Sequence, residues 1–148
     1  MQKNLNFSTN NLLGKWKIKR LIFDYYADNK FSFIGNAIIT DYKNYKNNYL
    51  FSEYGKLFFD KKVFNSTKSY RLNKVVNKWE IFHSNSSLFF SLNGTKTRQS
   101  IYHRCLEDEY KGDFRITSRE SFTIIWHVIG PHKTYYSKSI YKKHLHDQ

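Results

Sequence analysis

Proline, cysteine and acidic residues are all scarce in this chain of 148 residues. Pro131 is the single proline, so almost every backbone N–H is free to join a β-ladder. Cys105 is the single cysteine, which excludes an internal disulfide and fits a reducing compartment. No apolar run approaches the roughly 20 residues that a membrane span requires. These absences favour a soluble, cytoplasmic protein without a membrane span.

The N-terminal segment also lacks an apolar core. Met1–Asn11 is polar and rich in asparagine, and nothing in it resembles the hydrophobic part of a signal peptide. We expect residues 1–11 to form a flexible tail or a short lid. Residues 12–148 should form one domain, because a chain of this length normally builds a single hydrophobic core and no linker or fixed-period repeat interrupts it.

Acidic residues number 12 against 25 lysines and arginines, which gives a formal net charge of +13. Such an excess can indicate nucleic-acid binding. Lysine and asparagine are abundant throughout while arginine is scarce, however, which is typical of drift toward AT-rich codons, and no block of five like charges occurs. Nucleic-acid binding is therefore an alternative function, which requires a continuous basic face with exposed aromatic side chains.

Aromatic residues are plentiful, at 19 % of the chain, and they lie in short alternating runs that favour strands. From residue 15 to 22 the side chains alternate between two faces. One face carries Lys15, Lys17 and Lys19, and the other carries Trp16, Ile18, Arg20 and Ile22. About ten or eleven such runs follow one another at hairpin spacing, with turns predicted at Gly55 and Asn93-Gly94 and a bulge or bend at Gly35. The pattern predicts an all-β, up-and-down antiparallel barrel, like those of lipocalins and fatty-acid-binding proteins, rather than a two-sheet sandwich.

Arg20 is the most informative single residue. It shares the face of Trp16 and Ile18, which should point into the barrel. A buried guanidinium needs a partner, because an unpaired internal charge costs several kcal/mol. That partner is either the negative group of a bound ligand or an internal carboxylate, for which Glu53 and Asp108 are the candidates; stacking of the cation on Trp16 is a further possibility.

A second cluster surrounds His103, Asp108 and Tyr110. These side chains could act as general acids and bases on a small molecule in the cavity, which makes a small-molecule enzyme another alternative function. A third group flanks the predicted turn at Gly130-Pro131, where Trp126 precedes the turn and Lys133 and Tyr135 follow it.

Metal or haem binding is a lesser possibility. A single cysteine and scattered histidines lack the paired spacing of metal sites, so we expect no metal centre. His83, His103 and His127 lie within predicted strands and could ligate haem iron in a barrel cavity, although no haem-attachment motif is present. We expect no cofactor.

Two resemblances support the fold. Gly14-Lys15-Trp16 is similar to the Gly-x-Trp start of lipocalin-like (calycin) barrels, in which a basic residue from the last strand packs over the tryptophan; here Lys142 or Lys143 would take that place. Much of the chain also resembles a family of small bacterial proteins classed as a domain of unknown function (6314), and this resemblance implies a lipocalin-like barrel. The matching residues are Trp16, Arg20, Asp24, Glu53-Tyr54-Gly55, Tyr70, His103-Arg104-Cys105, Asp108-Glu109-Tyr110 and Gly130-Pro131-His132-Lys133-Thr134-Tyr135.

Together these features predict a barrel that binds a small, anionic and partly aromatic or apolar ligand in its interior. Arg20 would anchor the negative group, tyrosine hydroxyls would supply hydrogen bonds, and Trp126 would form a stacking wall. The residues expected to contact the ligand are Arg20, Tyr70, His103, Asp108, Tyr110, Trp126, Lys133 and Tyr135.

Overall fold

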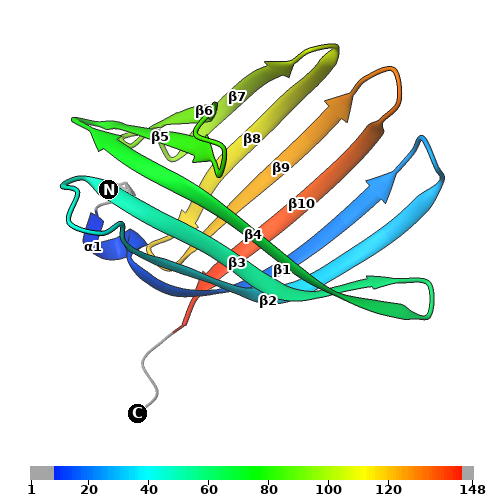
Figure 1. Ribbon diagram of the computed structural model, residues 1–148, viewed down its shortest axis with the longest axis horizontal. Helices are drawn as coiled ribbons and strands as arrows, with labels where there is room; N and C mark the ends of the chain where they lie inside the picture. The colour runs from blue at the N-terminus through cyan, green and yellow to red at the C-terminus, as the bar shows by residue number, and fades with distance from the viewer. Residues whose placement is uncertain (1–8, 145–148) are drawn as a thin grey trace.

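The computed structural model describes residues 9–144, in which one short helix precedes ten strands (Figure 1). Of the expected N-terminal tail, residues 1–8 lie outside this described part, and the helix α1 covers Thr9–Leu12. The strands are β1 (Gly14–Asp24), β2 (Asn29–Asp41), β3 (Asn48–Phe59), β4 (Lys62–Val75), β5 (Lys78–His83), β6 (Leu88–Asn93), β7 (Arg98–Cys105), β8 (Asp108–Ser118), β9 (Ser121–Ile129) and β10 (Thr134–Lys143). No helix within the described residues is long and apolar enough to cross a membrane.

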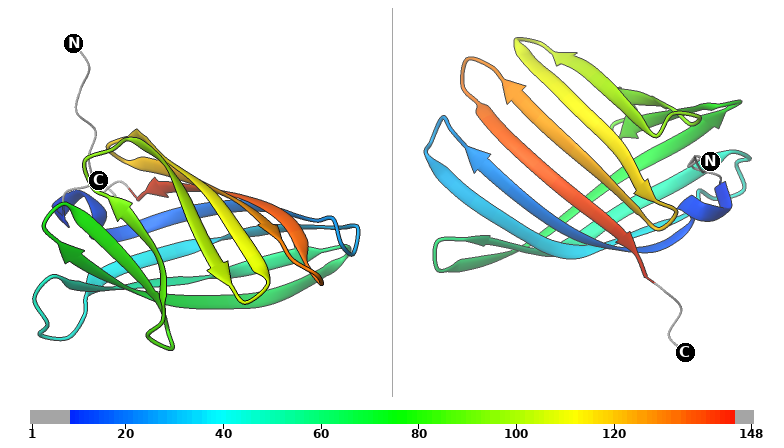
Figure 2. Two further views of the ribbon diagram at one scale, coloured as in Figure 1. Left: turned by 90° about the horizontal axis from the view of Figure 1, so that it is seen from above. Right: turned by 180° about the vertical axis from the view of Figure 1, so that it is seen from behind.

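All ten strands belong to one antiparallel sheet in the order β6-β5-β4-β3-β2-β1-β10-β9-β8-β7. Each strand pairs with its neighbours in sequence except that β6 does not pair with β7, and β1 also pairs with β10, so the sheet curls into a nearly closed barrel. This confirms the predicted up-and-down barrel. The open seam lies between β6 and β7 (Figure 2), where the Gln99 side-chain amide bonds both the N–H and the C=O of Asn93, each at 2.8 Å. At this seam the Gln99 side chain thus makes the two hydrogen bonds that a paired backbone residue would make in a closed sheet.

The narrow end of the barrel is closed around Trp16. Its side chain is fully buried, its indole N–H donates to the Leu12 carbonyl of α1 at 2.9 Å, and its ring packs edge-on against Phe122. The Lys143 ammonium lies over the same ring, 5.4 Å from its centroid. Of the two lysines expected in this position, Lys143 is therefore the one that occupies it. The remaining core residues include Ile18, Phe33, Ala37, Ile39, Tyr49, Leu72, Trp79, Ile81, Leu92, Ile101, Phe114, Ile116, Ile124 and Tyr141.

The turn predicted at Gly55 is wrong, because β3 continues through this residue and turns only after Phe59. The turn between β3 and β4 lies instead at residues 60–61. Gly55 pairs with Gly35 of β2 in an uninterrupted ladder, so the bulge expected at Gly35 is also absent from it. A methyl group at Gly55 would stand 2.5 Å from the Gly35 Cα and 2.9 Å from the Phe33 ring. Because neither glycine has a side chain, β2, β3 and the Phe33 ring can approach closely at this point, and neither glycine forms a turn.

Candidate functional site

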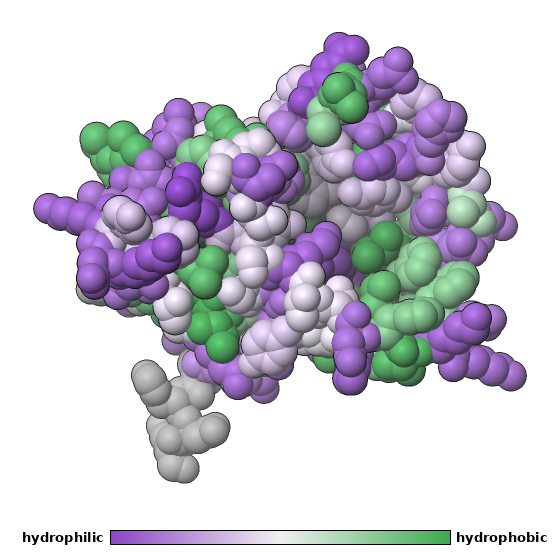
Figure 3. Space-filling model, in the orientation of Figure 1, coloured by the Kyte–Doolittle hydropathy of each residue, from purple (hydrophilic) through white to green (hydrophobic). Residues whose placement is uncertain are grey.

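The barrel encloses a cavity of about 350 Å³, within the range of small-molecule sites. The space-filling view shows the surface hollowed near the centre of the face on which the barrel opens (Figure 3). Apolar and aromatic side chains form most of the wall, with a few polar groups among them. The polar residues of the lining are Arg20, Asp24, Glu53, Lys68, Tyr70, Tyr110, Tyr135, Ser137, Ser139 and Tyr141.

A hydrogen-bonded group centred on Arg20 occupies the wall. The side chains of Arg20 and Glu53 are only 15 % and 4 % exposed, and Arg20 Nη2 lies 3.0 and 3.1 Å from the two carboxylate oxygens. Arg20 Nε donates to Ser139 Oγ at 2.5 Å and Nη2 donates to the Tyr141 hydroxyl at 2.8 Å. That hydroxyl in turn donates to Glu53 Oε2 at 2.5 Å. Of the internal partners that the sequence left open for Arg20, Glu53 is the one in contact.

This arrangement keeps the guanidinium of Arg20 charged and leaves one side of it unused. Burial opposes the charge on Arg20, but Tyr141 and Glu53 outweigh it and raise the pKa of the guanidinium above its ordinary value. Burial also raises the pKa of Tyr141 well above its usual range, so its hydroxyl keeps its proton. Within residues 9–144, Arg20 Nη1 donates no hydrogen bond. The free side of the fork can therefore bind an acceptor in the cavity.

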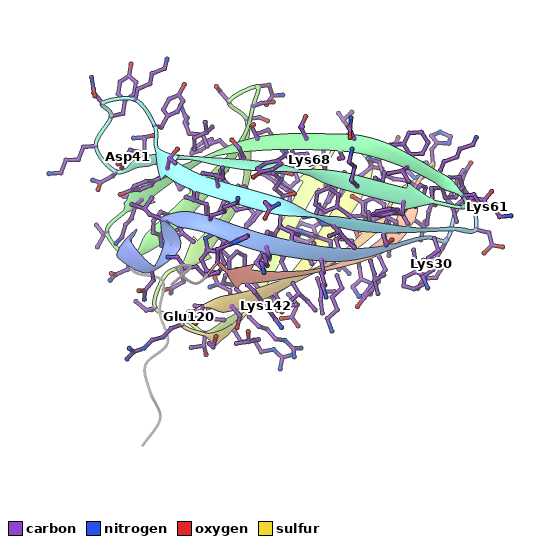
Figure 4. All side chains as sticks on the ribbon, turned by 90° about the horizontal axis from the view of Figure 1, so that it is seen from below. Lys30, Asp41, Lys61, Lys68, Glu120 and Lys142 are labelled. Carbon is purple, nitrogen blue, oxygen red and sulfur yellow. The ribbon has the colours of Figure 1, made fainter. Side chains whose placement is uncertain are left out.

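Lys68 supplies a second cation in the same cavity, and it was not among the predicted site residues. It lies on β4 directly across the ladder from Glu53 (Figure 4). Among the described residues no carboxylate forms an ion pair with it. Burial, and then the Arg20 charge, lower its pKa, while Glu53 opposes this shift. Strand alternation from the predicted Tyr70 would have placed Lys68 on the inward face.

Aromatic rings cover the opposite part of the wall, across the seam. Phe89 of β6 stacks on Trp126 of β9, with centroids 5.2 Å apart and planes 14° apart. It also stacks on Tyr70 at 6.1 Å and on His83 at 4.4 Å. Burial, followed by the Glu53 charge, raises the pKa of Tyr70 to about 12, so its hydroxyl remains a donor at neutral pH. These stacked rings offer a flat surface to a planar ligand.

The predicted site residues fall into two groups. Those that line the cavity are Arg20, Tyr70, Tyr110, Trp126 and Tyr135. The others, His103, Asp108 and Lys133, lie near it without forming its wall. The Lys133 ammonium donates to the Tyr110 hydroxyl at 3.1 Å and lies 3.4 Å from Asp108 Oδ2. Burial and the neighbouring Tyr110 raise the pKa of Tyr135.

The acid–base trio expected for an enzyme is not assembled. Asp108 is paired with Lys133, whereas His103 packs against the rings of Phe89 and Tyr110, at 5.3 and 5.7 Å. No hydrogen bond joins His103 to a carboxylate in the part of the chain that the structure describes. His127, considered above as a haem ligand, is exposed on the outer face and contacts Tyr136, so it cannot ligate iron in the cavity.

One solved structure supports the fold, and two others are similar to a lesser degree. An S-type phycobiliprotein lyase, CPES, from Guillardia theta is similar with a TM-score of 0.67 and 10 % identity, over 93 % of this chain and 91 % of that chain. A protein of unknown function from the DUF3598 family of Nostoc punctiforme is similar with a TM-score of 0.45 and 8 % identity. The match covers 94 % of this chain and 50 % of that chain. The protein EF1p2_mFAP2b bound to DFHBI is similar with a TM-score of 0.49 and 8 % identity. The match covers 91 % of this chain and 95 % of that chain.

The sequence comparisons place the chain in a family. Curated protein sequences give no match. The profile of DUF6314, a family of unknown function, matches residues 12–143, which span the barrel from the end of α1 to the end of β10. The chain therefore belongs to the DUF6314 family, and its fold is a calycin-like barrel.

Proposed function

We propose that the barrel binds one small organic anion with an aromatic or apolar body. Lys68 and the free side of the Arg20 guanidinium would hold the negative group, and the stacked rings would hold the body. The proposal rests on two cations in a cavity lined by aromatic rings. Lys68 has no ion-pair partner among the described residues, and one side of the Arg20 guanidinium makes no hydrogen bond to them. A filled barrel has no need of an unused internal donor such as Arg20 Nη1, since a polar group buried without a hydrogen bond costs free energy; Lys68 lines the cavity but is an exposed residue.

The charges at the centre of the cavity favour a ligand with a single negative charge. Arg20 and Glu53 neutralise each other, and Tyr141 stays protonated. Lys68 then contributes one positive charge beside this neutral pair. Asp24, the remaining charged side chain of the lining, lies at the end of β1, where its Oδ1 accepts a hydrogen bond from the Ala27 backbone N–H in the following turn. A ligand carboxylate next to Lys68 would balance the Lys68 charge locally.

The wall of the cavity favours a planar body. Phe89, Trp126 and Tyr70 present stacked faces, and the volume of about 350 Å³ suits a molecule of two or three fused rings. The fold similarity to a phycobiliprotein lyase agrees with a role in handling small molecules. The Tyr70 hydroxyl, whose pKa of about 12 keeps it protonated, could donate a further hydrogen bond to the ligand.

The proposal is tested by isothermal titration calorimetry with 2-naphthoate and its neutral analogue 2-naphthamide. Charge-assisted hydrogen bonds contribute about 1.5–3 kcal/mol, so the acid should bind on the order of 10- to 100-fold more tightly than the amide. In Lys68→Met the affinity for the acid should fall to that for the amide. Lys56→Met is the matched control, because Lys56 is exposed on β3 and bonds only Asn65. Equal affinity of the wild-type protein for acid and amide would contradict the proposal.

A further inference from the structure

The outward positions of β1 and β10 carry five exposed lysines on two adjacent strands, part of a face seen from outside in Figure 4. Lys17 stands directly opposite Lys142 in the β1–β10 ladder. Like charges in such a pair destabilise the strands. None of the five lysines forms an ion pair with any residue between 9 and 144. The stability of the fold therefore does not account for this arrangement. The five are Lys15, Lys17, Lys19, Lys138 and Lys142.

Exposed aliphatic side chains alternate with these lysines. Ile38 and Ile34 of β2 stand opposite Lys15 and Lys19. Leu21 of β1 stands opposite Lys138. The exposed fractions of Ile34 and Leu21 are 55 % and 44 %, large for aliphatic residues on strands. We name these eight residues the cationic face: Lys15, Lys17, Lys19, Leu21, Ile34, Ile38, Lys138 and Lys142.

Acidic residues are absent from the same strand faces, and Glu120, just before β9, is an acid that lies beside the end of β10 (Figure 4). The outward positions of β1, β2 and β10 contain no aspartate or glutamate. On β7 and β8, by contrast, Arg98 and Arg115 share Asp113 as an ion-pair partner. Exposed lysines also lie in the turns of the barrel, but the outward positions of β1 and β10 carry five of them with no acidic residue on the same strand faces.

We propose that the cationic face binds the surface of a lipid bilayer that contains anionic headgroups. Lysine stems can lie along apolar surface while their ammonium groups reach outward to phosphates and carboxylates. Each lysine near an anionic membrane increases partitioning by about fivefold. Leu21 and Ile34, each placed across a ladder from a lysine, can enter the boundary between headgroups and acyl chains.

A bilayer fits this face better than a nucleic acid does. The eight residues include neither arginine, which recognises phosphates and bases through its fork, nor an aromatic ring on which a base could stack. Exposed rings lie beyond the face rather than within it: Tyr25 and Tyr26 in the turn after β1 are 64 % and 62 % exposed. Binding of a single-stranded nucleic acid is therefore kept as an outcome of the test. The proposal does not depend on the ligand site, because the inward residues of the same strands form the cavity wall.

Vesicle flotation tests the proposal, with phosphatidylcholine vesicles compared with vesicles that contain about 30 % phosphatidylserine. The wild-type protein should float with the anionic vesicles alone, and added salt should release it. The triple variant Lys17→Glu/Lys19→Glu/Lys138→Glu should lose on the order of a hundredfold in partition coefficient. The matched control, Lys61→Glu/Lys62→Glu/Lys96→Glu, changes the net charge equally at exposed positions in the β3–β4 turn, at the first residue of β4 and in the β6–β7 connection, and should bind as the wild type does.

A second variant keeps the test valid if the triple variant does not fold. Lys17→Gln/Lys142→Gln removes the opposed cations, so it should unfold at a higher temperature and still bind anionic vesicles about tenfold to thirtyfold more weakly. Equal loss in the face and control triples, absence of binding to anionic vesicles, or equal binding to both vesicle types would overturn the proposal. Displacement of the protein from vesicles by an equimolar single-stranded oligonucleotide would overturn it as well, and would assign the face to nucleic acid.

Discussion

Replacement of Arg20 by methionine is the most informative perturbation of the cavity wall. The substitution removes the only ion-pair partner that the described residues give to Glu53, whose side chain is 4 % exposed. Breaking a buried pair by removal of one partner costs about 3–5 kcal/mol, because the remaining charge is uncompensated. Since whole domains are stable by about 5–15 kcal/mol, the variant should be strongly destabilised at neutral pH.

The electrostatic part of the stability lost in Arg20→Met has an upper limit that depends on pH. The Glu53 carboxyl of the variant can bind a proton, and this costs about 1.36 kcal/mol for each pH unit above the ordinary glutamate value of about 4.3. The electrostatic part is therefore at most about 3.7 kcal/mol at pH 7 and about 1 kcal/mol at pH 5. The sign follows because the folded variant binds a proton that the unfolded chain releases above pH 4.3, so stability falls as pH rises. Lost hydrogen bonds to Ser139 and Tyr141 add about 1 kcal/mol each at every pH.

Urea unfolding at pH 7 and at pH 5 measures this effect. The deficit of Arg20→Met relative to the wild type should shrink by up to about 2.7 kcal/mol between the two pH values. The double variant Arg20→Met/Glu53→Leu removes both charges and should regain most of the loss at pH 7, because an apolar replacement of a buried pair is often neutral or better. A deficit that is the same at both pH values would refute the reasoning, as would a double variant no more stable than the single one.

Three further predictions follow from other parts of the structure. Val76→Gly should stabilise the protein by about 1 kcal/mol in urea unfolding, because this β-branched residue has a φ of 56° and is 83 % exposed, so little is lost with its side chain; a lower midpoint would contradict this. Gly55→Ala should destabilise by about 3 kcal/mol, since its methyl group would meet the Gly35 backbone, and an unchanged midpoint would show that the ladder can separate there. Binding of 2-naphthoate should weaken as pH rises through a range below 10.5, because burial and the Arg20 charge lower the pKa of Lys68. The Lys68→Arg variant should retain its affinity to higher pH, since arginine stays charged. If the pH profiles of the variant and the wild type were identical, Lys68 would not be the residue that binds the carboxylate.

The sequence predicted the barrel because side-chain alternation is a local property. Trp16, Ile18 and Arg20 alternate with lysines, and this pattern suffices to assign an inward and an outward face. Gly55 could not be interpreted in the same way. Its role depends on Gly35 and on the Phe33 ring from another strand, whereas a lone glycine between two strand-like runs normally indicates a turn.

The candidate site could be predicted only in part, for a similar reason. Alternation placed Arg20 inward, but the choice between Glu53 and a ligand as its partner depends on the register of β1, β2 and β3, which the sequence does not specify. Lys68 was overlooked because one lysine among many carries no local signal; only its position across from Glu53 distinguishes it. Asp108 and Lys133 are 25 positions apart in the chain, and the turn between β9 and β10 brings them together.

The central claim is that an organic anion occupies the interior of the barrel rather than its basic exterior. Intermolecular nuclear Overhauser effects between 2-naphthoate and the methyl groups of the labelled protein test it directly. Contacts with Ile22 and Ile124, which line the cavity, are expected. Contacts confined to Ile34 and Ile38 of the outer face, or no contacts at a saturating concentration, would contradict it.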